Sequence, residues 1–387
     1  GVSDKIRWFT DLTFIEPGGR ASRIGPSFLP APLHSMPSFL AASSLSLGDK
    51  LAIARALMSM MRKLPPDSEE NFLAWLRRHG QTERAIQRFW KVVLVSALNE
   101  DLERSSVRYA VQVFRESFLK SAAAGRMGVP SVPLSELYGS ATDYIRARGG
   151  DVLLRSSATA LAPKPTGVKV ISSAGDRDFD FALLAVPFQS AASLLPAGAP
   201  AAPIRQKLER FQSSPITGIH FWFDREVTAL PHAVLLDRTI QWMFQKSKLH
   251  ANARTENLGS YLELVVSASR GLLEKSRQEI LDLALGELAE FFPAVKEAKV
   301  IKATVIKEVY ATYSIAPGLD PFRPAAQTEW PAIFLAGDWT ATNWPATMEG
   351  AVRSGYLAAE AISQAAGSPQ KFLAADLTAK GFMRMFA

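Results

Sequence analysis

The chain contains no cysteine. Disulfides, thiolate metal sites and cysteine nucleophiles are therefore excluded, and the composition agrees with a reducing compartment. Histidine is also scarce, since only His34, His79, His220, His232 and His250 occur. None of these forms an H-x-x-x-H pair or another spacing typical of metal ligands, so the sequence predicts no metal site.

No apolar run approaches the ~20 residues that a helix needs to span a bilayer. The formal net charge is +7, but the basic residues are scattered through amphipathic segments and form no long run. This distribution argues against a nucleic-acid partner and is compatible with an anionic membrane surface. With 387 residues, of which 48% are hydrophobic, the chain is long enough for two globular domains.

Two kinds of pattern alternate along the chain. Short strands with a hairpin turn at Glu16-Pro17-Gly18-Gly19 come first, and residues 46–148 predict a series of helices that begins at a cap on Ser46. Strands resume at Asp151, and a mixture of strands and helices follows. Further predicted strands cover 152–154, 158–161, 168–171, 215–223, 233–245, 259–267 and 299–312, and helices cover about 272–291 and 347–364.

Two short runs are apolar throughout. They are Phe181–Pro187 and Ile333–Ala336. Continuous apolar runs of this length are typical of strands that are covered on both faces in an α/β sheet. Because such strands alternate with helix-rich and antiparallel segments, the sequence predicts an α/β fold in which one domain is assembled from separated pieces of the chain.

The second apolar run leads into a Gly-Asp turn and then a helix. Strand ends at the carboxyl edge of an α/β sheet bind ligands, so this order places the carboxylate of Asp338 in a binding position. Gly337 allows the backbone to approach a ligand closely. A helix that begins near Thr347-Met348 directs free N–H groups and a positive dipole end toward the same place. A flavin that becomes negative at its pyrimidine edge on reduction suits such a helix start.

The string A-G-D-W-T…P-x-T-M-E-G-A-V-x-S-G-x-x-A-A, within residues 333–362, resembles the C-terminal FAD signature of the flavin amine oxidase and phytoene desaturase superfamily. The resemblance implies that the cofactor is FAD. It also implies a Rossmann-like FAD/NAD(P)-binding domain interleaved with an α+β substrate domain. The implied FAD contacts are Gly337, Asp338, Thr347, Met348, Glu349 and Ala351, with a weaker match at Ala158 for the adenine end.

A narrower resemblance covers most of the chain. The strings LPAPLHSMPSFL (29–40), LSLGDKLAIARALM (45–58), FWKVVLVSALNEDLERSS (89–106) and GVPSVPLSELY (128–138) look like the hydroxysqualene dehydroxylase family of bacterial hopanoid synthesis. That family converts hydroxysqualene to squalene with reduced FAD. The implied division is a substrate domain at 1–135 and 191–310 and an FAD domain at 136–190 and 311–387.

The superfamily's opening G-x-G-x-x-G, which cradles the pyrophosphate, does not occur here. Gly18-Gly19-Arg20 does not replace it, because Glu16 and Pro17 precede it without the required strand and loop. We therefore expect an N-terminally truncated chain. An inactive fragment that cannot hold FAD remains a rival interpretation.

The residue before Met-Glu-Gly is Thr347, where amine oxidases commonly place an aromatic residue. A hydrocarbon-like substrate in an apolar tunnel fits this position better, although a carotenoid-type desaturase or an amine oxidase remains an alternative. The pattern identifies no catalytic acid. The candidate substrate-binding residues are Trp90, Trp222, Trp242 and Trp344, and further candidate lining residues are Phe114, Phe118, Phe221, Phe223 and Met243.

Two segments are candidates for membrane contact. Residues 45–63 are amphipathic with several basic residues, and the tail 372–387 carries the run Phe382-Met383-Arg384-Met385-Phe386. A lipid substrate makes such contact useful. We expect a cytoplasmic protein that attaches peripherally to the inner face of the cytoplasmic membrane.

Overall fold

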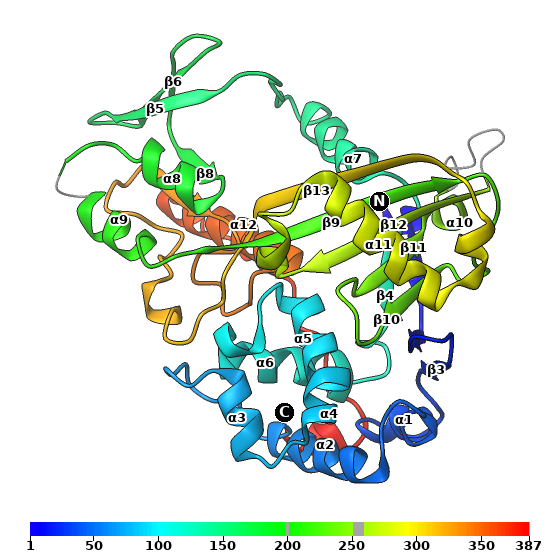
Figure 1. Cartoon of the computed structure of the whole chain (residues 1–387). Coiled ribbons are helices and arrows are strands. Elements are labelled where there is room, and N and C mark those ends of the chain that lie inside the picture. The colour runs from blue at the N-terminus through cyan, green and yellow to red at the C-terminus, as the bar shows by residue number, and fades with distance from the viewer. Residues whose placement is uncertain (199–200, 251–258, 387) are drawn as a thin grey trace.

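The computed structural model describes residues 1–198, 201–250 and 259–386. Figure 1 shows a helical layer from the first third of the chain, a large twisted sheet beside it, and a third region built around helix α12. The strands are β1 Ile6–Phe9, β2 Leu12–Ile15, β3 Ala21–Ile24, β4 Met127–Pro130, β5 Ala158–Pro163, β6 Val168–Ser172, β7 Arg177–Phe179, β8 Ala182–Ala185, β9 Ser213–Phe223, β10 His232–Leu235, β11 Trp242–Gln245, β12 Ser260–Ser267, β13 Val300–Tyr313 and β14 Ile333–Ala336.

The helices alternate with these strands. They are α1 Met36–Ala41, α2 Leu47–Met60, α3 Phe72–Arg78, α4 Glu83–Ala85, α5 Lys91–Leu98, α6 Val107–Phe114, α7 Leu134–Arg146, α8 Phe188–Leu194, α9 Ala202–Leu208, α10 Lys246–Leu249, α11 Arg277–Phe291 and α12 Met348–Ala365, with two π-helical segments, η3 Ile86–Trp90 and η5 Arg115–Leu119. No helix in the described ranges is long and apolar enough to cross a bilayer.

A seven-stranded sheet in the order β13-β9-β12-β11-β10-β2-β3 forms the centre of the molecule. Its long antiparallel strands β9, β12 and β13 bury alternate side chains, such as Phe221 and Leu264, against α11. Alternation of this kind is typical of an antiparallel sheet with one covered face. The other face of the sheet carries aromatic residues, which are described with the site.

The helical layer packs around a second core. A capping box starts α2, because Ser46 Oγ accepts from the Asp49 N–H at 3.2 Å and the Ser46 N–H donates to Asp49 Oδ2 at 2.8 Å. The largest fully buried side chains here include Trp90 and Phe114. This layer covers the lower side of the sheet in Figure 1.

The third region joins two distant segments. Strand β8 pairs in parallel with β14, so that Leu184 lies opposite Leu335, and α12 packs on this pair. The antiparallel strands β5, β6 and β7 form a separate sheet that extends away from the body in Figure 1. The division into domains at 135, 190 and 310 stays a prediction, although the seven-stranded sheet and the β8–β14 pair each join segments that are far apart in sequence.

Several predicted elements are confirmed. The hairpin at Glu16–Gly19 joins β2 to β3, where the Glu16 N–H donates to the Arg20 carbonyl at 2.9 Å. The predicted strand at 333–336 and the helix at 347–364 also form, the helix with its cap at Thr347 and its body over Met348–Ala365.

Other predictions are wrong. Residues 152–154 form no strand, because Leu153 and Leu154 lie in an exposed turn. The strand at 181–187 is not covered on both faces, since β8 pairs with β14 alone within the described residues and the side chain of Leu183 is exposed. Strand β4 was not predicted, because its partner β1 lies more than 100 residues earlier in the chain.

Candidate functional site

The turn after β14 is held by two hydrogen bonds and has room for glycine alone. Gly337 has a φ of 147°, and a Cβ there would lie 2.2 Å from the Trp339 indole nitrogen. The indole N–H of Trp339 donates to the Val186 carbonyl at 2.9 Å, and the Gly337 N–H donates to Ser354 Oγ at 2.7 Å. Only glycine fits this position without displacing Trp339, and the turn is fixed to both the β8 end and α12.

The carboxylate of Asp338 follows this turn and is half-buried. Burial raises the pKa of Asp338 to about 6, and the nearby charge of Arg323 partly opposes that rise. In the described chain no side chain donates a hydrogen bond to this carboxylate. A Cβ at Gly350 would lie 3.6 Å from the Asp338 Cβ, so the carboxylate stands beside the first turn of α12. It is therefore available to accept hydrogen bonds from a ligand.

The guanidinium of Arg323 lies behind the turn and is buried. Its Nη2 donates to the Asp338 carbonyl at 2.8 Å and to Thr342 Oγ1 at 2.9 Å. Its Nη1 donates to Asp320 Oδ1 at 3.2 Å and to the hydroxyl of Tyr109 on α6. Arg323 thus connects the turn to the helical layer. The sequence analysis missed it, because a single arginine in a loop carries no pattern.

Helix α12 begins at the cap that the sequence predicts. Thr347 Oγ1 accepts from the Gly350 N–H at 3.1 Å. Met348 is 68% exposed, and the hydroxyl of Tyr138 donates to its sulfur at 3.3 Å. The other N–H groups of the first turn and their positive dipole end lie next to the Asp338 turn.

Two further predicted contacts, Glu349 and Ala351, lie on the exposed side of the same helix start. Glu349 accepts from Arg353 at 3.2 Å, and Arg353 also donates to Asp376 at 2.7 Å. The guanidinium of Arg353 lies 4.6 Å from the ring centre of Trp344. The structure therefore brings Gly337, Asp338, Thr347 and Met348 together, and Trp344 joins them through Arg353.

Ala158 is not brought into this group. It begins β5 and pairs with Ser172 of β6, in a sheet separate from the β8–β14 pair. No hydrogen bond or strand pairing within the described ranges joins Ala158 to Asp338. Its assignment to the adenine end stays a prediction.

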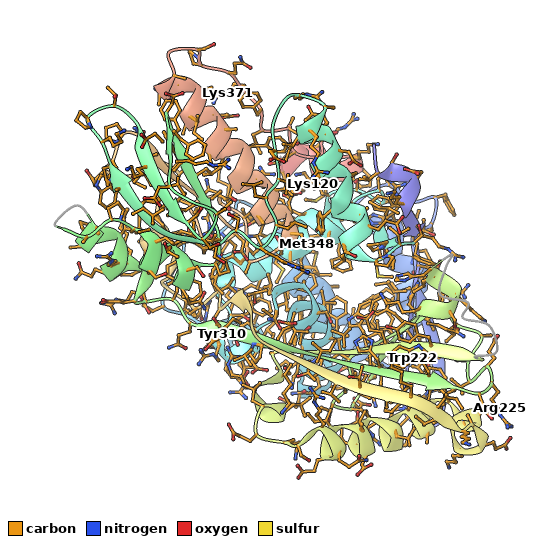
Figure 2. All side chains as sticks on the ribbon, turned by 90° about the horizontal axis from the view of Figure 1, so that it is seen from above. Lys120, Trp222, Arg225, Tyr310, Met348 and Lys371 are labelled. Carbon is orange, nitrogen blue, oxygen red and sulfur yellow. The ribbon has the colours of Figure 1, made fainter. Side chains whose placement is uncertain are left out.

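Trp222 and Trp242 lie on the sheet. Trp222 stacks on Tyr261 with ring centres 4.4 Å apart, and the indole N–H of Trp242 donates to Ser96 Oγ at 2.7 Å. Figure 2 shows Trp222 well separated from Met348, toward the far end of the sheet. The four candidate tryptophans therefore do not share one cavity. Trp242 belongs to the packing between sheet and helices, and Trp222 packs against neighbouring side chains of the sheet.

An apolar cavity of about 490 Å³ lies between β2, the helical layer and the C-terminal segment. None of its lining side chains is Asp, Glu, Lys or Arg within the described residues, and His34 is the only titratable one. Below we call this space the apolar cavity. It is lined by Thr10, Leu12, Phe14, Ile24, Gly25, Pro26, Pro32, Leu33, His34, Ser35, Met36, Phe39, Ala54, Leu57, Met58, Met61, Phe89, Val93, Phe114, Ser117, Phe118, Leu119, Ala122, Gly125, Phe382, Met385 and Phe386.

Of the candidate lining residues, Phe114 and Phe118 line this cavity. Trp90 does not line it. Trp90 is fully buried behind Phe114, with ring centres 4.7 Å apart, and its indole N–H donates to Gln81 Oε1 at 2.8 Å. Apolar composition could not separate these roles, because a core residue and a tunnel residue have the same chemistry.

The two π-helical segments both contribute to the apolar cavity. Phe89 lies in η3 and Phe118 lies in η5, and both side chains line the cavity. A π segment inserts an extra residue into the helical turn, costs stability, and occurs frequently at functional sites. Their presence on two walls of one cavity favours a ligand site over ordinary core packing.

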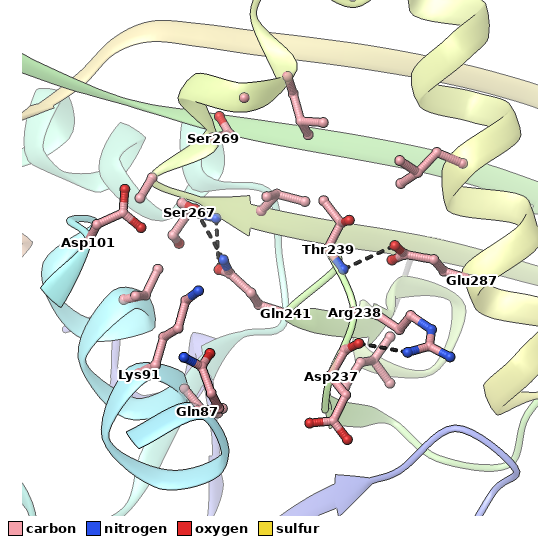
Figure 3. Close-up of a pocket in the computed structure, with 18 of the residues that line it drawn as sticks. Gln87, Lys91, Asp101, Asp237, Arg238, Thr239, Gln241, Ser267, Ser269 and Glu287 are labelled. Carbon is pink, nitrogen blue, oxygen red and sulfur yellow. Dashed lines mark hydrogen bonds between the residues drawn. The ribbon is translucent and has the colours of Figure 1, made fainter. Parts of the chain in front are cut away.

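A second pocket, of about 730 Å³, is polar (Figure 3). Some of its groups are paired, since the N–H of Thr239 donates to Glu287 at 3.0 Å and the N–H of Ser267 donates to Gln241 at 2.9 Å. The Asp237 carboxylate on its rim binds Arg88 at 2.5 Å. Because charged side chains such as Lys91 and Glu287 line this pocket, it does not offer the apolar binding site that the sequence predicts.

Residues 6–363 match the family described as flavin containing amine oxidoreductase, and the chain belongs to this family. The predicted fold class and FAD as the cofactor are thereby confirmed. The chain is a member of a family of FAD-dependent oxidoreductases, and the resemblance to its superfamily is confirmed at that level.

The chain is similar to curated desaturases. It is 26% identical over 385 residues to the 15-cis-phytoene desaturase of Synechococcus elongatus, covering 93% of this chain and 80% of that protein. It is 27% identical over 383 residues to the chloroplastic/chromoplastic 15-cis-phytoene desaturase of Solanum lycopersicum, covering 94% of this chain and 66% of that protein. The chain thus spans just under two thirds of the length of the plant protein.

Solved structures share the fold. An oxidoreductase from Methanosarcina mazei matches with a TM-score of 0.68 at 15% identity, covering 90% of this chain and 80% of that chain. A putrescine oxidase bound to putrescine matches with a TM-score of 0.64 at 14% identity, covering 94% of this chain and 84% of that chain. At these identities the likeness shows the fold and nothing about the substrate.

The described residues fit part of a bound flavin. The carboxylate of Asp338, to which no side chain of the described residues donates, suits the ribityl hydroxyls, and the first turn of α12, at Met348 and Glu349, suits the pyrimidine edge. The fit rests on two features of the turn: the small residue at Gly337, and the adjacency of Asp338 to Gly350. No glycine-rich phosphate loop occurs in the sequence, so these residues are predicted to contact only the ribityl and pyrimidine half of the cofactor, and this assignment stays a prediction.

Proposed function

We propose that this flavin-dependent oxidoreductase acts on a long apolar isoprenoid that binds in the apolar cavity. The observation that carries the proposal is the lining of that cavity, in which no acidic or basic side chain occurs within the described residues and His34 is the only titratable one. A long hydrocarbon chain has no polar groups to satisfy and gains free energy from such a surface. The volume of the apolar cavity, about 490 Å³, lies within the range of ligand cavities.

We call the turn at Gly337-Asp338 the flavin turn. The wall between this turn and the apolar cavity supports the proposal. Phe114 of α6 and Phe118 of η5 line the cavity, while Gln112 on the same helix donates to the Asn343 carbonyl at 3.1 Å in the loop before α12. Ser117 borders both the cavity and the groove that holds Trp344. The helical segment α6–η5 therefore contributes to the cavity wall and also contacts the loop that precedes α12.

When bound, FAD supplies hydride-transfer chemistry. The chain's own residues hold the reactants and exclude water. Phe89, Phe114 and Phe118 form an apolar surface that orients the isoprenoid and keeps the reacting carbon dry. Asp338 and the first turn of α12 would contact the bound flavin. A proton-transfer residue is not assigned.

The first candidate reaction is carotenoid-type desaturation. This reaction would remove a hydride from one carbon and a proton from its neighbour, so that a C–C bond would become C=C, and bound oxidised FAD would supply the two-electron acceptor. The desaturase names of the curated relatives, at 26% and 27% identity, support this reaction. The family membership and the apolar cavity agree with it.

The second candidate is reductive dehydroxylation of hydroxysqualene to squalene, as in hopanoid synthesis. Here the hydroxyl group leaves as water after protonation, and the carbon receives a hydride from reduced FAD. The long irregular strings at 29–40 and 89–106 support this reaction. The presence of one buried imidazole, His34, in the apolar cavity also favours a substrate with one polar group.

Amine oxidation is less well supported. A bound ammonium group needs a carboxylate or an aromatic cage, because an unpaired buried charge is costly. Thr347 occupies the place where many amine oxidases have an aromatic residue, and no acidic residue lines the cavity within the described ranges.

The mouth of the apolar cavity supports peripheral attachment to a membrane. Leu33, Met36, Met58, Phe382 and Met385 line the cavity and are also exposed to solvent. Basic residues accompany this apolar rim, namely Lys50, Arg55, Arg62, Lys63 and Arg384. An apolar surface with a basic border binds anionic lipid surfaces. We propose that the substrate enters from the inner face of the cytoplasmic membrane through this rim.

Product analysis tests the proposal. The FAD-loaded full-length protein is incubated anaerobically with phytoene and oxidised FAD, with hydroxysqualene and reduced FAD, and with putrescine and oxidised FAD. We expect a desaturated product from the first mixture or squalene from the second. Turnover of putrescine with no conversion of either isoprenoid would overturn the proposal.

A further inference from the structure

His34 is the one ionisable side chain that lines the apolar cavity within the described residues. It lies in the short helix Leu33–Ser35 and is 3% exposed. Its backbone is fixed, because its carbonyl accepts hydrogen bonds from both the N–H and the hydroxyl of Ser27, the latter at 2.8 Å. The imidazole is therefore presented to the cavity by an anchored segment.

The ring nitrogen Nδ1 of His34 is buried and has no hydrogen-bond partner within the described chain. Buried polar atoms in folded proteins are nearly always paired, so an unpaired one requires an explanation. The neighbouring cavity supplies space for a partner. A ligand atom that pairs with the imidazole would recover the free energy that its burial costs.

The protonation state of His34 fits this role. Burial lowers the pKa of His34 below that of a free imidazole. The imidazole is therefore neutral near pH 7, with one nitrogen that donates and one that accepts. A hydroxyl group, which also donates and accepts, matches it, whereas an ammonium or a carboxylate would bring an unpaired charge into the cavity.

We propose that His34 determines specificity by forming a hydrogen bond with a single hydroxyl group on an otherwise apolar isoprenoid. The inference rests on the proposed function and deepens it, because it separates a hydroxylated substrate from a pure hydrocarbon. His34 is flanked by Leu33 and Met36, which are exposed at the cavity rim. The hydroxyl group is thereby held beside His34, and the apolar chain contacts the phenylalanine side chains that line the cavity.

A matched pair of ligands tests this inference. The dissociation constants of hydroxysqualene and squalene are measured by titration calorimetry in one detergent, with the full-length FAD-loaded protein. The wild type is expected to bind the alcohol about tenfold more tightly, as one net hydrogen bond allows. In His34→Leu the affinity for the alcohol falls by that factor while the affinity for squalene is kept. In His34→Asn, which can still form a hydrogen bond, part of the preference returns.

Phe39→Leu serves as the control, because Phe39 lines the same cavity without a polar atom. This substitution is expected to reduce the affinity for both ligands by the same factor. An unchanged preference in His34→Leu overturns the role of His34 while leaving the proposed function in place. If the wild type binds neither ligand, the inference fails, and the proposed function fails as well if phytoene does not bind either.

A second measurement needs no substitution. The ¹⁵N shifts of the imidazole nitrogens of His34, observed in the wild-type protein, are expected to move when hydroxysqualene is added and to stay unchanged with squalene. Equal shifts with both ligands, or no shift with the alcohol, contradict the proposed hydrogen bond.

Discussion

Arg323 Nη2 donates a hydrogen bond of 2.8 Å to the backbone carbonyl of Asp338. The same guanidinium reaches Tyr109 on α6 and Asp320, so one buried side chain joins the flavin turn to the helical layer that carries the apolar cavity. We therefore predict that Arg323 positions the proposed cofactor contacts relative to the proposed substrate cavity.

Replacement of Arg323 is expected to affect folding and FAD together. Arg323→Leu leaves Asp320 and Tyr109 without their partner, and we expect a loss of about 3 kcal/mol in the free energy of unfolding by urea denaturation. The dissociation constant of FAD should rise as well. Arg323→Lys keeps the positive charge but lacks the several N–H donors of the planar guanidinium. It should recover part of the lost stability and part of the lost FAD affinity. Arg210→Leu, at an exposed arginine, is the control, and an equal effect there would contradict this role.

The carboxyl group of Asp338 predicts a pH dependence with a defined sign. Its pKa is about 6 in the folded chain and near 3.8 in an unfolded one, so the folded state binds the proton more tightly. Stability from this group is fully present below about pH 4 and is lost as the pH rises through 6.

Asp338→Asn mimics the protonated group. It should therefore match the wild type at pH 4 and be more stable above pH 6 by about 1 to 3 kcal/mol in denaturant titrations of the FAD-free protein. Its affinity for FAD should fall, because the amide is a weaker acceptor than the carboxylate. A stability difference that does not change between pH 4 and 7 would contradict the burial of this carboxyl group.

Two glycines of the signature should respond in opposite directions to alanine. A Cβ at Gly337 would lie 2.2 Å from the Trp339 indole nitrogen, so Gly337→Ala should destabilise the fold and weaken FAD binding. Gly355, in the middle of α12, has no atom within 4 Å of an added Cβ. Gly355→Ala should raise the melting temperature, because it should add up to about 1 kcal/mol to the free energy of unfolding. Thermal melts of both variants provide the check, and equal effects would refute the geometry of the turn.

The cavity rim predicts the site of membrane contact. Met385 is 73% exposed and lines the cavity mouth, whereas Tyr310 is 74% exposed on β13 and does not line it. Met385→Asp should reduce flotation with anionic vesicles several-fold, since a charge on an apolar anchor opposes insertion. Tyr310→Asp should leave flotation unchanged. The rim is not the membrane contact if Tyr310→Asp reduces flotation as much as Met385→Asp does.

The strand, turn and helix over Ile333–Ala365 could be predicted from sequence within a residue or two. Each step there has a local cause: an apolar run, a Gly-Asp turn and a threonine cap. The hairpin at Glu16–Gly19 is similar, because turn residues and alternating side chains lie next to each other in the sequence.

Features that depend on distant partners could not be predicted. Strand β4 pairs with β1 across more than 100 residues, and strand β8 buries Leu184 but leaves Leu183 exposed. His34 and Arg323 were missed as site residues, since nothing in their sequence neighbourhood distinguishes them from surface residues. The candidate tryptophans could not be sorted from sequence alone. Aromatic composition does not distinguish a residue of the buried core, such as Trp90, from a residue that lines a cavity.

The central claim is that the apolar cavity holds the substrate, and a cavity-filling variant tests it directly. Ala54 lines the cavity from α2, and Ala54→Trp would occupy space there without touching the flavin turn. Anaerobic stopped-flow absorbance follows the flavin while phytoene is mixed with oxidised enzyme or hydroxysqualene with reduced enzyme. We predict that Ala54→Trp slows the isoprenoid-dependent change at least tenfold and leaves chemical reduction by dithionite unchanged. Equal isoprenoid-dependent rates in wild type and variant would contradict the claim.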